Sequence, residues 1–433
     1  MEDASQTWTP DPHDISREPS CLSTLKCTQS DQGEFPRSAK WCSDGSTVIA
    51  QMESGTFQRY DVSFQEPIMQ VREERPAKTF PQPAPVLDFL WYPTASSLDA
   101  ASFCFVASVR ECPVKLLDAS DGRLRASYKI VDHRERQIAP HSLAFNLTAQ
   151  KLYCGFEDAI EMFDLSRPGE GTRIPTTPSK KSKDGLKGII SALAFSSSYT
   201  AEESFYAVGS FTPTAQNIAM FSDAQSEPLM YVGGGPRAGV TQLRFNPTKP
   251  HILYAGYRGH SSGMIYSWDI RSNVDTPLEI FYKSPADKGP TRSNQRMYFD
   301  IDITGRLLST GDQARVSNGS VSVFELDDYD ASIALSAEVE PSDDNLYPKT
   351  ISPALQFKAH EDAVGSIAFH PFRPILLSAS GSRHFLDDDD GSGSDTSSSG
   401  EGELSGPAKH SRRSRPVTLD PTMKIWDLRK DAT

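Results

Sequence analysis

Short apolar runs alternate with polar turns along the chain, and one order of elements recurs seven times. Each copy has a strand that ends in an aromatic or large apolar residue, a second strand that ends in small residues, and a third that ends in an apolar residue plus an acid. The clearest copies are VTQLRFNPTKPHILYAGYRGHSSGMIYSWDIR at residues 240–271 and AVGSIAFHPFRPILLSAS at residues 363–380, which resumes as MKIWDLR at residues 423–429. Alternation with a period of two indicates strands, so the pattern predicts an all-β protein.

The spacing of the copies indicates a ring of sheets. Their first strands end 50 to 68 residues apart, at Trp41, Trp91, Phe145, Phe195, Phe245, Ile301 and Phe369. A WD-type blade needs about 40 to 45 residues, so each copy fits one blade with enlarged loops. The apolar and acidic pairs that end the third strands include Asp61, Asp118, Asp164, Trp268, Asp269, Trp426 and Asp427. We predict a seven-bladed WD-repeat β-propeller over residues 21–433, preceded by a disordered tail at residues 1–20.

The last copy lacks an outer strand, because the sequence ends six residues after Asp427. An open strand edge would be a liability for the ring. The segment CLSTLKCT at residues 21–28 has the composition of a strand. We therefore predict that this N-terminal strand completes the last blade and closes the propeller.

The net charge of -13 is concentrated in two segments. Residues 326–345 and 386–405 hold all of it, because each carries seven acids and no Lys or Arg, which leaves the rest of the chain nearly neutral. We predict disordered acidic inserts at residues 326–350 and 386–420, the second of which interrupts the last blade. This insert is either a solubilising loop or an electrostatic mimic that competes with nucleic acid. The basic cluster at residues 409–416 is an import signal or a phosphate-binding arm.

Turns between second and third strands open on the same rim of a propeller as the loops that lead into first strands. On this rim the sequence places Arg110, Phe156, Tyr257, Arg258, Arg296, Arg383, His384 and Phe385. Arginine forks and flat rings are what single-stranded RNA needs for phosphate contact and base stacking. The same residue types form hot spots for protein docking, so the residues alone leave both interpretations open. His360, in the sequence AHED, is expected to hydrogen-bond an acid of its own blade.

Several function classes lack a sequence signal. Motifs for a Ser nucleophile, a P-loop, a zinc protease or a redox dithiol do not occur, so we expect no enzyme and no cofactor. The six cysteines are never closer than five intervening residues, and we expect reduced thiols and no metal site. The chain has no apolar run of membrane-spanning length and no basic, apolar leader, so we expect an intracellular protein without a membrane partner.

Longer motifs carry a family resemblance. VASVRECPVKLLDASDGRLRASY at residues 106–128, PHSLAFNLTAQKLYCGF at 140–156, NQRMYFDIDITGRLLSTG at 294–311 and SASGSRHF at 378–385 resemble the telomerase Cajal body protein family. The resemblance covers roughly residues 21–433. It implies a nuclear, non-enzymatic RNA-binding adaptor that recognises box H/ACA-type small Cajal body RNAs (scaRNA), and possibly telomerase RNA, and that directs these ribonucleoprotein particles to Cajal bodies.

The resemblance also implies partners and site residues. The expected partners are these RNAs and the dyskerin-type core proteins of box H/ACA particles, with no role for DNA. The family's arginine-containing turns correspond to Arg110, Arg296 and Arg383. Ser382 stands where the family usually has Gln, which can alter one base contact. The alternative function is a WD-repeat protein scaffold that associates with spliceosomal or other nuclear RNA particles.

Overall fold

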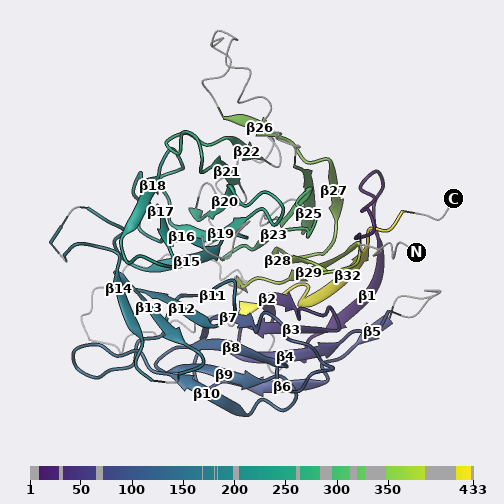
Figure 1. Ribbon diagram of the computed structural model, residues 1–433. Coiled ribbons are helices and arrows are strands. Elements are labelled where there is room, and N and C mark those ends of the chain that lie inside the picture. The colour runs from purple at the N-terminus through teal and green to yellow at the C-terminus, as the bar shows by residue number, and fades with distance from the viewer. Residues whose placement is uncertain are drawn as a thin grey trace, which may run out of the picture.

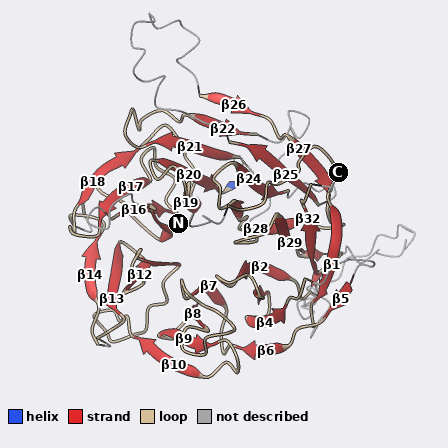
Figure 2. Cartoon of the chain, turned by 45° about the vertical axis from the view of Figure 1, so that its right-hand side comes forward, coloured by secondary structure: helices blue, strands red, loops and turns tan. Residues whose placement is uncertain are grey.

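Each of the seven sequence copies folds as one antiparallel sheet, and the sheets stand around a central channel in the computed structural model (Figures 1 and 2). The structure describes residues 9–28, 33–64, 72–167, 169–179, 181–182, 184–197, 204–259, 264–282, 295–312, 319–326, 348–385 and 416–430. Within these ranges every regular element is a β-strand, and no helix is long and apolar enough to cross a membrane. The predicted seven-bladed WD-repeat propeller is confirmed.

Four strands build each blade, from the channel outward. Blade 1 contains β2 (Pro36–Trp41), β3 (Thr47–Met52), β4 (Thr56–Asp61) and β6 (Lys78–Pro81), and blade 2 contains β7 (Val86–Trp91), β8 (Cys104–Val109), β9 (Val114–Asp118) and β10 (Leu124–Tyr128). Blade 3 contains β11 (Ser142–Phe145), β12 (Lys151–Phe156), β13 (Ala159–Asp164) and β14 (Thr172–Pro175), and blade 4 contains β15 (Ile190–Phe195), β16 (Phe205–Ser210), β17 (Ile218–Ser222) and β18 (Pro228–Val232). Blade 5 contains β19 (Val240–Phe245), β20 (Ile252–Tyr257), β21 (Ile265–Asp269) and β22 (Glu279–Phe281), and blade 6 contains β23 (Phe299–Ile301), β24 (Leu307–Gly311), β25 (Ser320–Glu325) and β27 (Leu355–Lys358). Blade 7 contains β28 (Val364–Phe369), β29 (Ile375–Ser380), β32 (Thr422–Asp427) and β1 (Ser20–Lys26).

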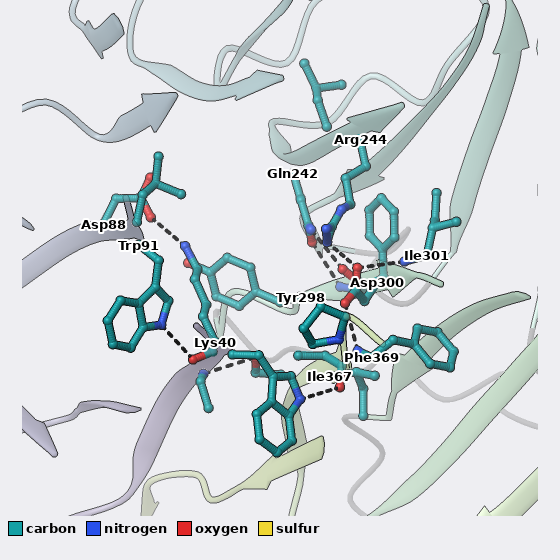
Figure 3. Close-up of a pocket in the computed structure, with 18 of the residues that line it drawn as sticks. Lys40, Asp88, Trp91, Gln242, Arg244, Tyr298, Asp300, Ile301, Ile367 and Phe369 are labelled. Atoms are coloured by element: carbon teal, nitrogen blue, oxygen red, sulfur yellow. Dashed lines mark hydrogen bonds and ion pairs between the residues drawn. The ribbon is translucent and has the colours of Figure 1, made fainter. Parts of the chain in front are cut away.

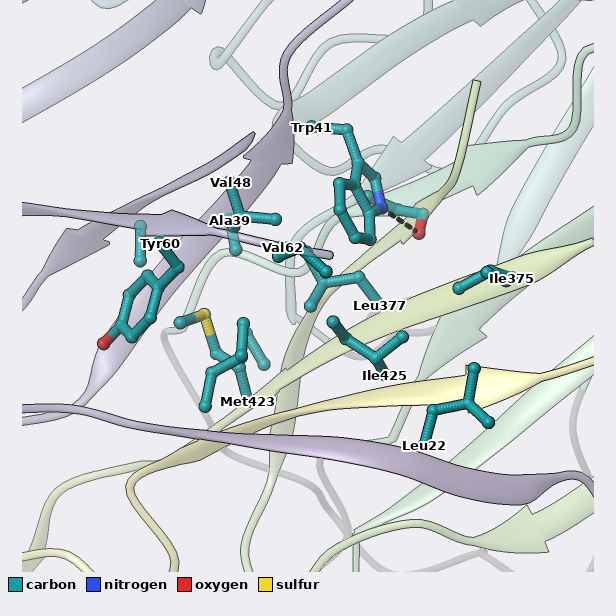
Figure 4. Packing of buried hydrophobic residues seen from close by; sticks show 14 of the residues in the cluster. Leu22, Ala39, Trp41, Val48, Tyr60, Val62, Ile375, Leu377, Met423 and Ile425 are labelled. Carbon is teal, nitrogen blue, oxygen red and sulfur yellow. Dashed lines mark hydrogen bonds between the residues drawn. The ribbon is translucent and has the colours of Figure 1, made fainter. Parts of the chain in front are cut away.

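The N-terminal strand β1 closes the ring as predicted. It pairs antiparallel with β32, from Ser20 opposite Asp427 to Lys26 opposite Thr422. Its apolar side chains Leu22 and Leu25 enter a core that blade 7 shares with blade 1 (Figure 4). The first and last parts of the chain are therefore joined by one hydrogen-bonded ladder and one hydrophobic cluster.

Two further strands cover outer edges. β5 (Arg72–Glu74), from blade 1, lies parallel to β1 on blade 7, and β26 (Lys349–Ile351), from blade 6, lies parallel to β22 on blade 5. Both come from the connection between the third and fourth strands of the following blade. The sequence repeat gives no sign of them, because they fall in the enlarged loops between copies.

Neighbouring blades are also joined at the channel by a closed circle of seven side-chain-to-backbone hydrogen bonds. Around the ring these are Trp41 Nε1 to Ala368 O (3.3 Å), Trp91 Nε1 to Lys40 O (3.0 Å), Leu143 N to Asp88 Oδ2 (3.0 Å), Ser142 Oγ to Ile190 O (2.8 Å), Ser191 Oγ to Val240 O (2.6 Å), Gln242 Nε2 to Phe299 O (2.8 Å) and Phe369 N to Asp300 Oδ2 (2.8 Å). Each bond fixes the inner strand of one blade against that of the next.

The apolar and acidic pairs of the repeat have two structural roles. Most of the acids cap the turn that follows: Asp118, Asp164, Asp269 and Asp427 each accept a hydrogen bond from the backbone N–H two residues on, at 2.8–2.9 Å. Asp61 instead contacts Arg59 at 2.9 Å. The two tryptophans are buried plugs, and Trp268 donates to Gly233 O at 3.0 Å.

Blade 7 contains a buried polar chain that ties its loop to its core. Asp420 Oδ2 contacts His360 Nδ1 at 3.0 Å, His360 Nε2 contacts Ser378 Oγ at 2.7 Å, and Trp426 Nε1 donates to Ser378 Oγ at 2.8 Å. The predicted structural role of His360 is confirmed by these contacts. The loop before β28 is thereby fastened to the middle strands of its own blade.

Two predicted boundaries differ from the structure. Part of the predicted tail, residues 9–19, contacts blade 7, where Asp14 N donates to Leu428 O at 2.6 Å. The ends of both predicted inserts, residues 348–350 and 416–420, belong to described strands and turns, because they pair with or bond to neighbouring blades. Residues 1–8, 327–347 and 386–415, which are the start of the predicted tail and most of the two predicted inserts, lie outside the described residues.

We expect the closure to support the whole propeller. Leu25 has no exposed surface, so Leu25→Ala removes buried apolar area and should lower the free energy of unfolding by about 2–5 kcal/mol in one cooperative transition. Leu98→Ala, at a side chain that is 95% exposed, is the matched control and should change it by less than about 0.5 kcal/mol. Urea denaturation measures both. A Leu25→Ala protein as stable as the control would contradict closure by β1.

A histidine on the turn between the first and second strands of blade 7 contacts the equivalent turn of blade 1. We call this contact the histidine clip. His370 Nδ1 accepts hydrogen bonds from Phe372 N and Arg373 N at 3.1 Å each, so the ring proton lies on Nε2, which donates to Gly45 O at 3.1 Å. Burial lowers the pKa of His370 to about 4. Gly45 has φ +73°, and a Cβ there would lie 2.3 Å from His370 Nε2, so only glycine fits against the ring.

This clip should make stability depend on pH. The pKa of His370 is lower in the folded state than in the unfolded chain, so its contribution is complete above about pH 6.5 and is lost as the pH falls toward 4. Between pH 7.5 and pH 5 the loss should be about 2 kcal/mol. His370→Asn should be less stable at neutral pH but should lose about 2 kcal/mol less on acidification, as measured by urea unfolding at both pH values. Parallel losses in the two proteins would refute the role of His370.

Candidate functional site

The predicted site lies on one face of the ring, which we call the upper rim. It consists of the turns between second and third strands and the loops that lead into first strands. In five blades a backbone hydrogen bond of 2.8–3.0 Å joins the turn to the lead-in loop: Glu53 N to Phe35 O, Arg110 N to Pro85 O, Phe211 N to Ile189 O, Arg258 N to Gly239 O and Gly381 N to Ala363 O. Turn and loop are therefore neighbours, and their side chains share this face.

The blade-7 turn is anchored on one carboxylate. Asp362, which is 4% exposed, accepts hydrogen bonds from Ser382 Oγ at 2.6 Å, His384 Nε2 at 2.9 Å and Leu419 N at 3.0 Å. Burial raises the pKa of Asp362, but the hydrogen bonds from Ser382 and His384 outweigh it, so the pKa lies below its ordinary value. The hydroxyl of Ser382 is thus committed to holding the turn.

A short hairpin continues from this anchor. β30 (His384–Phe385) pairs with β31 (Pro416–Val417), so the two ends of the predicted acidic insert leave the rim side by side. The base of the hairpin is fixed through Asp362, His384 and Leu419. The position at which the insert leaves the propeller is therefore well defined, next to the predicted site residues.

Arg383 and Phe385 are the exposed groups of this turn. The side chain of Arg383 is 58% exposed and forms an ion pair with Glu53 on the neighbouring blade-1 turn, and Phe385 is 62% exposed. Glu53 also lies 3.4 Å from Arg37 Nε. The side chain of Glu53 is only 12% exposed, but it keeps its contact with Arg37 when Arg383 turns to another anion, so the exchange leaves no unpaired carboxylate.

Arg296 reaches over the inner strands at the mouth of the channel. Its Nε donates to Thr241 O at 2.9 Å and its Nη2 donates to Ser191 O at 2.8 Å, while its guanidinium lies 5.1 Å from the centre of the Tyr298 ring. The adjacent Gln295 donates to Gly381 O at 2.9 Å. The lead-in loop of blade 6 therefore links the blade-7 turn to blades 4 and 5.

Arg110 completes the set of rim arginines. Its side chain is exposed at the blade-2 turn. Burial lowers the pKa of His141, and the positive charges of Arg296 and Arg110 lower it further. His141 thus lies within electrostatic range of both arginines and of Glu157, which raises the pKa of His141.

Three other predicted residues have different surroundings. Phe156 and Tyr257 are 4% and 3% exposed, because their rings point into the blades. Arg258 lies over the ring of Phe211 at 4.9 Å, and Arg173 lies over Phe156 at 5.1 Å. Because they are buried, the rings of Phe156 and Tyr257 pack inside the blades, below the rim. The exposed part of the predicted site therefore consists of Arg110, Arg383 and Phe385, whereas Arg296, His384 and Arg258 are half-buried.

A cavity of about 560 Å³ occupies the central channel, and two ion pairs lie in its wall (Figure 3). Lys40 lies 3.5 Å from Asp88, and Arg244 forms an ion pair with Asp300. Burial lowers the pKa of Lys40 and raises that of Asp300, which the opposite charges counteract. No group of three metal-ligating side chains occurs in the described ranges. The channel charges therefore serve mainly to hold the inner strands.

The residues that position the site were not identified from the sequence. Glu53, Arg37, Gln295 and Asp362 fix the exposed arginines and the hairpin. Glu53 occupies the blade-1 position equivalent to Arg110, directly after the second strand, so the repeat register places it on the same rim. Asp362 gives no such signal, because an acid in a loop is usually solvated and only the structure shows that it is buried.

Comparisons with known proteins agree with the repeats. A model of the WD domain, G-beta repeat, matches residues 351–388. The chain is 30% identical to telomerase Cajal body protein 1 of Mus musculus over 93% of this chain and 68% of the relative, and 28% identical to that of Homo sapiens over 90% and 63%. It is 27% identical to guanine nucleotide-binding protein negative regulator 1 of Schizosaccharomyces pombe over 64% and 68%. The chain thus spans about two thirds of the length of these relatives.

The buried anchor can be tested by changing one atom. Asp362→Asn removes the negative charge that five donors share, so it should lower the free energy of unfolding by about 1–3 kcal/mol. It should also speed hydrogen exchange at the amides of Ser382 and Leu419. Asp61→Asn, at an acid that is 54% exposed, is the control and should leave both quantities nearly unchanged. Unaltered exchange in Asp362→Asn would show that the turn does not depend on this carboxylate.

Proposed function

The chain belongs to the telomerase Cajal body protein family, and from this premise we propose that it is a non-enzymatic RNA-binding adaptor of the nucleus. Its ligands would be box H/ACA-type small Cajal body RNAs, with telomerase RNA as a further candidate. It would direct these particles to Cajal bodies together with dyskerin-type core proteins. The names of the relatives support a link to telomerase and Cajal bodies, and the WD repeats support a binding role without catalysis.

The observation that carries the proposal is the pair Arg383 and Phe385 on the upper rim. One offers an exposed guanidinium and the other an exposed ring, 58% and 62% accessible, on a turn anchored by Asp362. A guanidinium can bind a phosphate or a base edge through two parallel hydrogen bonds, and an aromatic ring can stack on an unpaired base. Side chains held on a fixed turn lose less conformational entropy when a ligand binds.

Arg296 and Arg110 extend this surface across the channel mouth. Arg296 is held by two backbone carbonyls and by Tyr298, so its guanidinium is already oriented. Both arginines lie close enough to His141 to lower its pKa, although burial is the larger cause. A single-stranded loop that stacks on Phe385 would have three cations within one rim to contact its backbone.

The alternative of a protein scaffold has one observation in its favour. Arg383 is already paired with Glu53, and ion pairs of this kind occur at protein interfaces as readily as at RNA sites. Crosslinking in cells followed by sequencing of the bound RNA separates the two. A defined set of box H/ACA-type RNAs supports the adaptor, whereas background recovery supports the scaffold.

We expect Arg383→Ala to weaken binding of a box H/ACA-type small Cajal body RNA by about 1–3 kcal/mol, or roughly 5- to 150-fold, while the protein stays folded. Phe385→Ala should act in the same direction through lost stacking. Arg306→Ala is the control, because Arg306 is exposed on the turn between β23 and β24, at the opposite end of the inner strands. Fluorescence anisotropy measures affinity and thermal melting checks the fold. Equal affinity of wild type and Arg383→Ala, or of cognate and scrambled loops, would overturn the proposal.

A further inference from the structure

The outer edges of the blades are protected in two ways in the described part of the chain. The edges of β1 and β22 are covered by the parallel strands β5 and β26. The edge strands β6, β10, β14 and β27 are uncovered, but each carries a Lys or Arg, namely Lys78, Arg125, Arg173 and Lys358. Positive charge on an edge strand discourages pairing with another strand.

β18 has neither protection. It is the outermost strand of blade 4, and its sequence PLMYV contains no charged residue. Leu229 is 43% exposed, and pairing with β17 is regular from Met230 to Val232. Met230 and Val232 pack toward blade 5, whereas Tyr231 packs toward blade 3. β18 is thus hydrogen-bonded to β17 on its inner side, and its outer edge is apolar and uncharged.

Among the described residues, the connection that covers the other two edges does not cover β18. Each covering strand comes from the connection between the third and fourth strands of the following blade: residues 62–77 for β5 and 326–354 for β26. For blade 4 the corresponding connection is residues 270–278, which is much shorter and forms no strand. It only touches the end of β18, where Gly233 N donates to Val274 O at 2.9 Å.

We propose that the outer edge of β18 is a docking site for an extended, uncharged segment of a partner protein, which adds to blade 4 as a fifth strand parallel to β18. The two covered blades show the geometry, since β5 and β26 each pair through three residues with a blade's outer strand. The regular part of β18, Met230–Val232, has the same length. In this mode of recognition the main chain supplies affinity, and alternate side chains supply specificity. Met230 and Val232 would contact one face of the added strand and Tyr231 the other, while Leu229, at the register shift, would contact its end.

A second copy of this chain fits the edge less well. A three-residue ladder between two propellers would bury far less than the roughly 1,200–2,000 Å² of a stable interface. A flexible segment can instead follow the edge without bringing a second propeller against it. The site lies on the circumference of the ring, away from the upper rim, and does not depend on the proposed RNA binding.

The experiment pans a phage-displayed library of linear peptides against the full chain and measures the enriched peptides by fluorescence anisotropy. Leu229→Lys gives β18 the charge that the other open edges carry, and it should weaken binding about tenfold or more. Leu124→Lys, at a 58% exposed side chain of β10, is the matched control and should change affinity by less than about twofold. Bound peptide should slow amide hydrogen exchange within residues 228–232.

Three results would overturn the proposal. One is equal binding to wild type and Leu229→Lys, and another is exchange protection confined to other blades. The third is concentration-dependent dimerisation of the wild type that Leu229→Lys abolishes in analytical ultracentrifugation, because a second copy would then cover the edge. Both lysine variants lie at exposed positions, so unchanged melting temperatures would show that a loss of binding is local.

Discussion

Closure of the ring is the constraint on which the remaining structure depends. A circle of sheets has no stable open form, because the first and last blades would each expose an apolar face. The ladder between β1 and β32 joins the two ends of the described chain, and Trp41 bonds to Ala368 O across the same seam. Once the ring is closed, the seven lead-in loops have fixed positions relative to one another. Residues as distant in sequence as Arg110 and Arg383 then share one rim.

The same constraint explains how polar groups are used near the channel. Asp88 and Asp300 would be costly to bury alone, but Lys40 and Arg244 pair with them, and both carboxylates also accept backbone N–H groups of the adjacent blade. Charge therefore fixes the angle between blades. Apolar packing holds each blade to its neighbours but tolerates sliding, whereas a directed hydrogen bond at the inner strand does not.

The repeat predicted the propeller, its closure and the rim, because all three follow from the period of the strands. β5 and β26 could not be predicted in this way, since a parallel pairing with a distant edge leaves no periodic signal. The rim prediction placed turns correctly but could not orient side chains. Phe156 and Tyr257 occupy the last positions of their second strands and face the core, whereas Phe385 follows a turn anchored by Asp362 and faces solvent. Successive residues of a strand point to opposite faces, so a shift of one residue moves a side chain from the core to the solvent.

The ion pair between Arg383 and Glu53 affects which ligands the proposed site would select. Apart from the acidic segments the chain is nearly neutral, and Arg383 is balanced by Glu53, so long-range attraction for an arbitrary polyanion is weak. A phosphate must displace Glu53 before Arg383 can bind it, and a base must meet Phe385 at the same time. Binding then requires a ligand that satisfies several groups together. Selectivity on such a rim comes from the fixed distances between these groups, which the closed ring maintains.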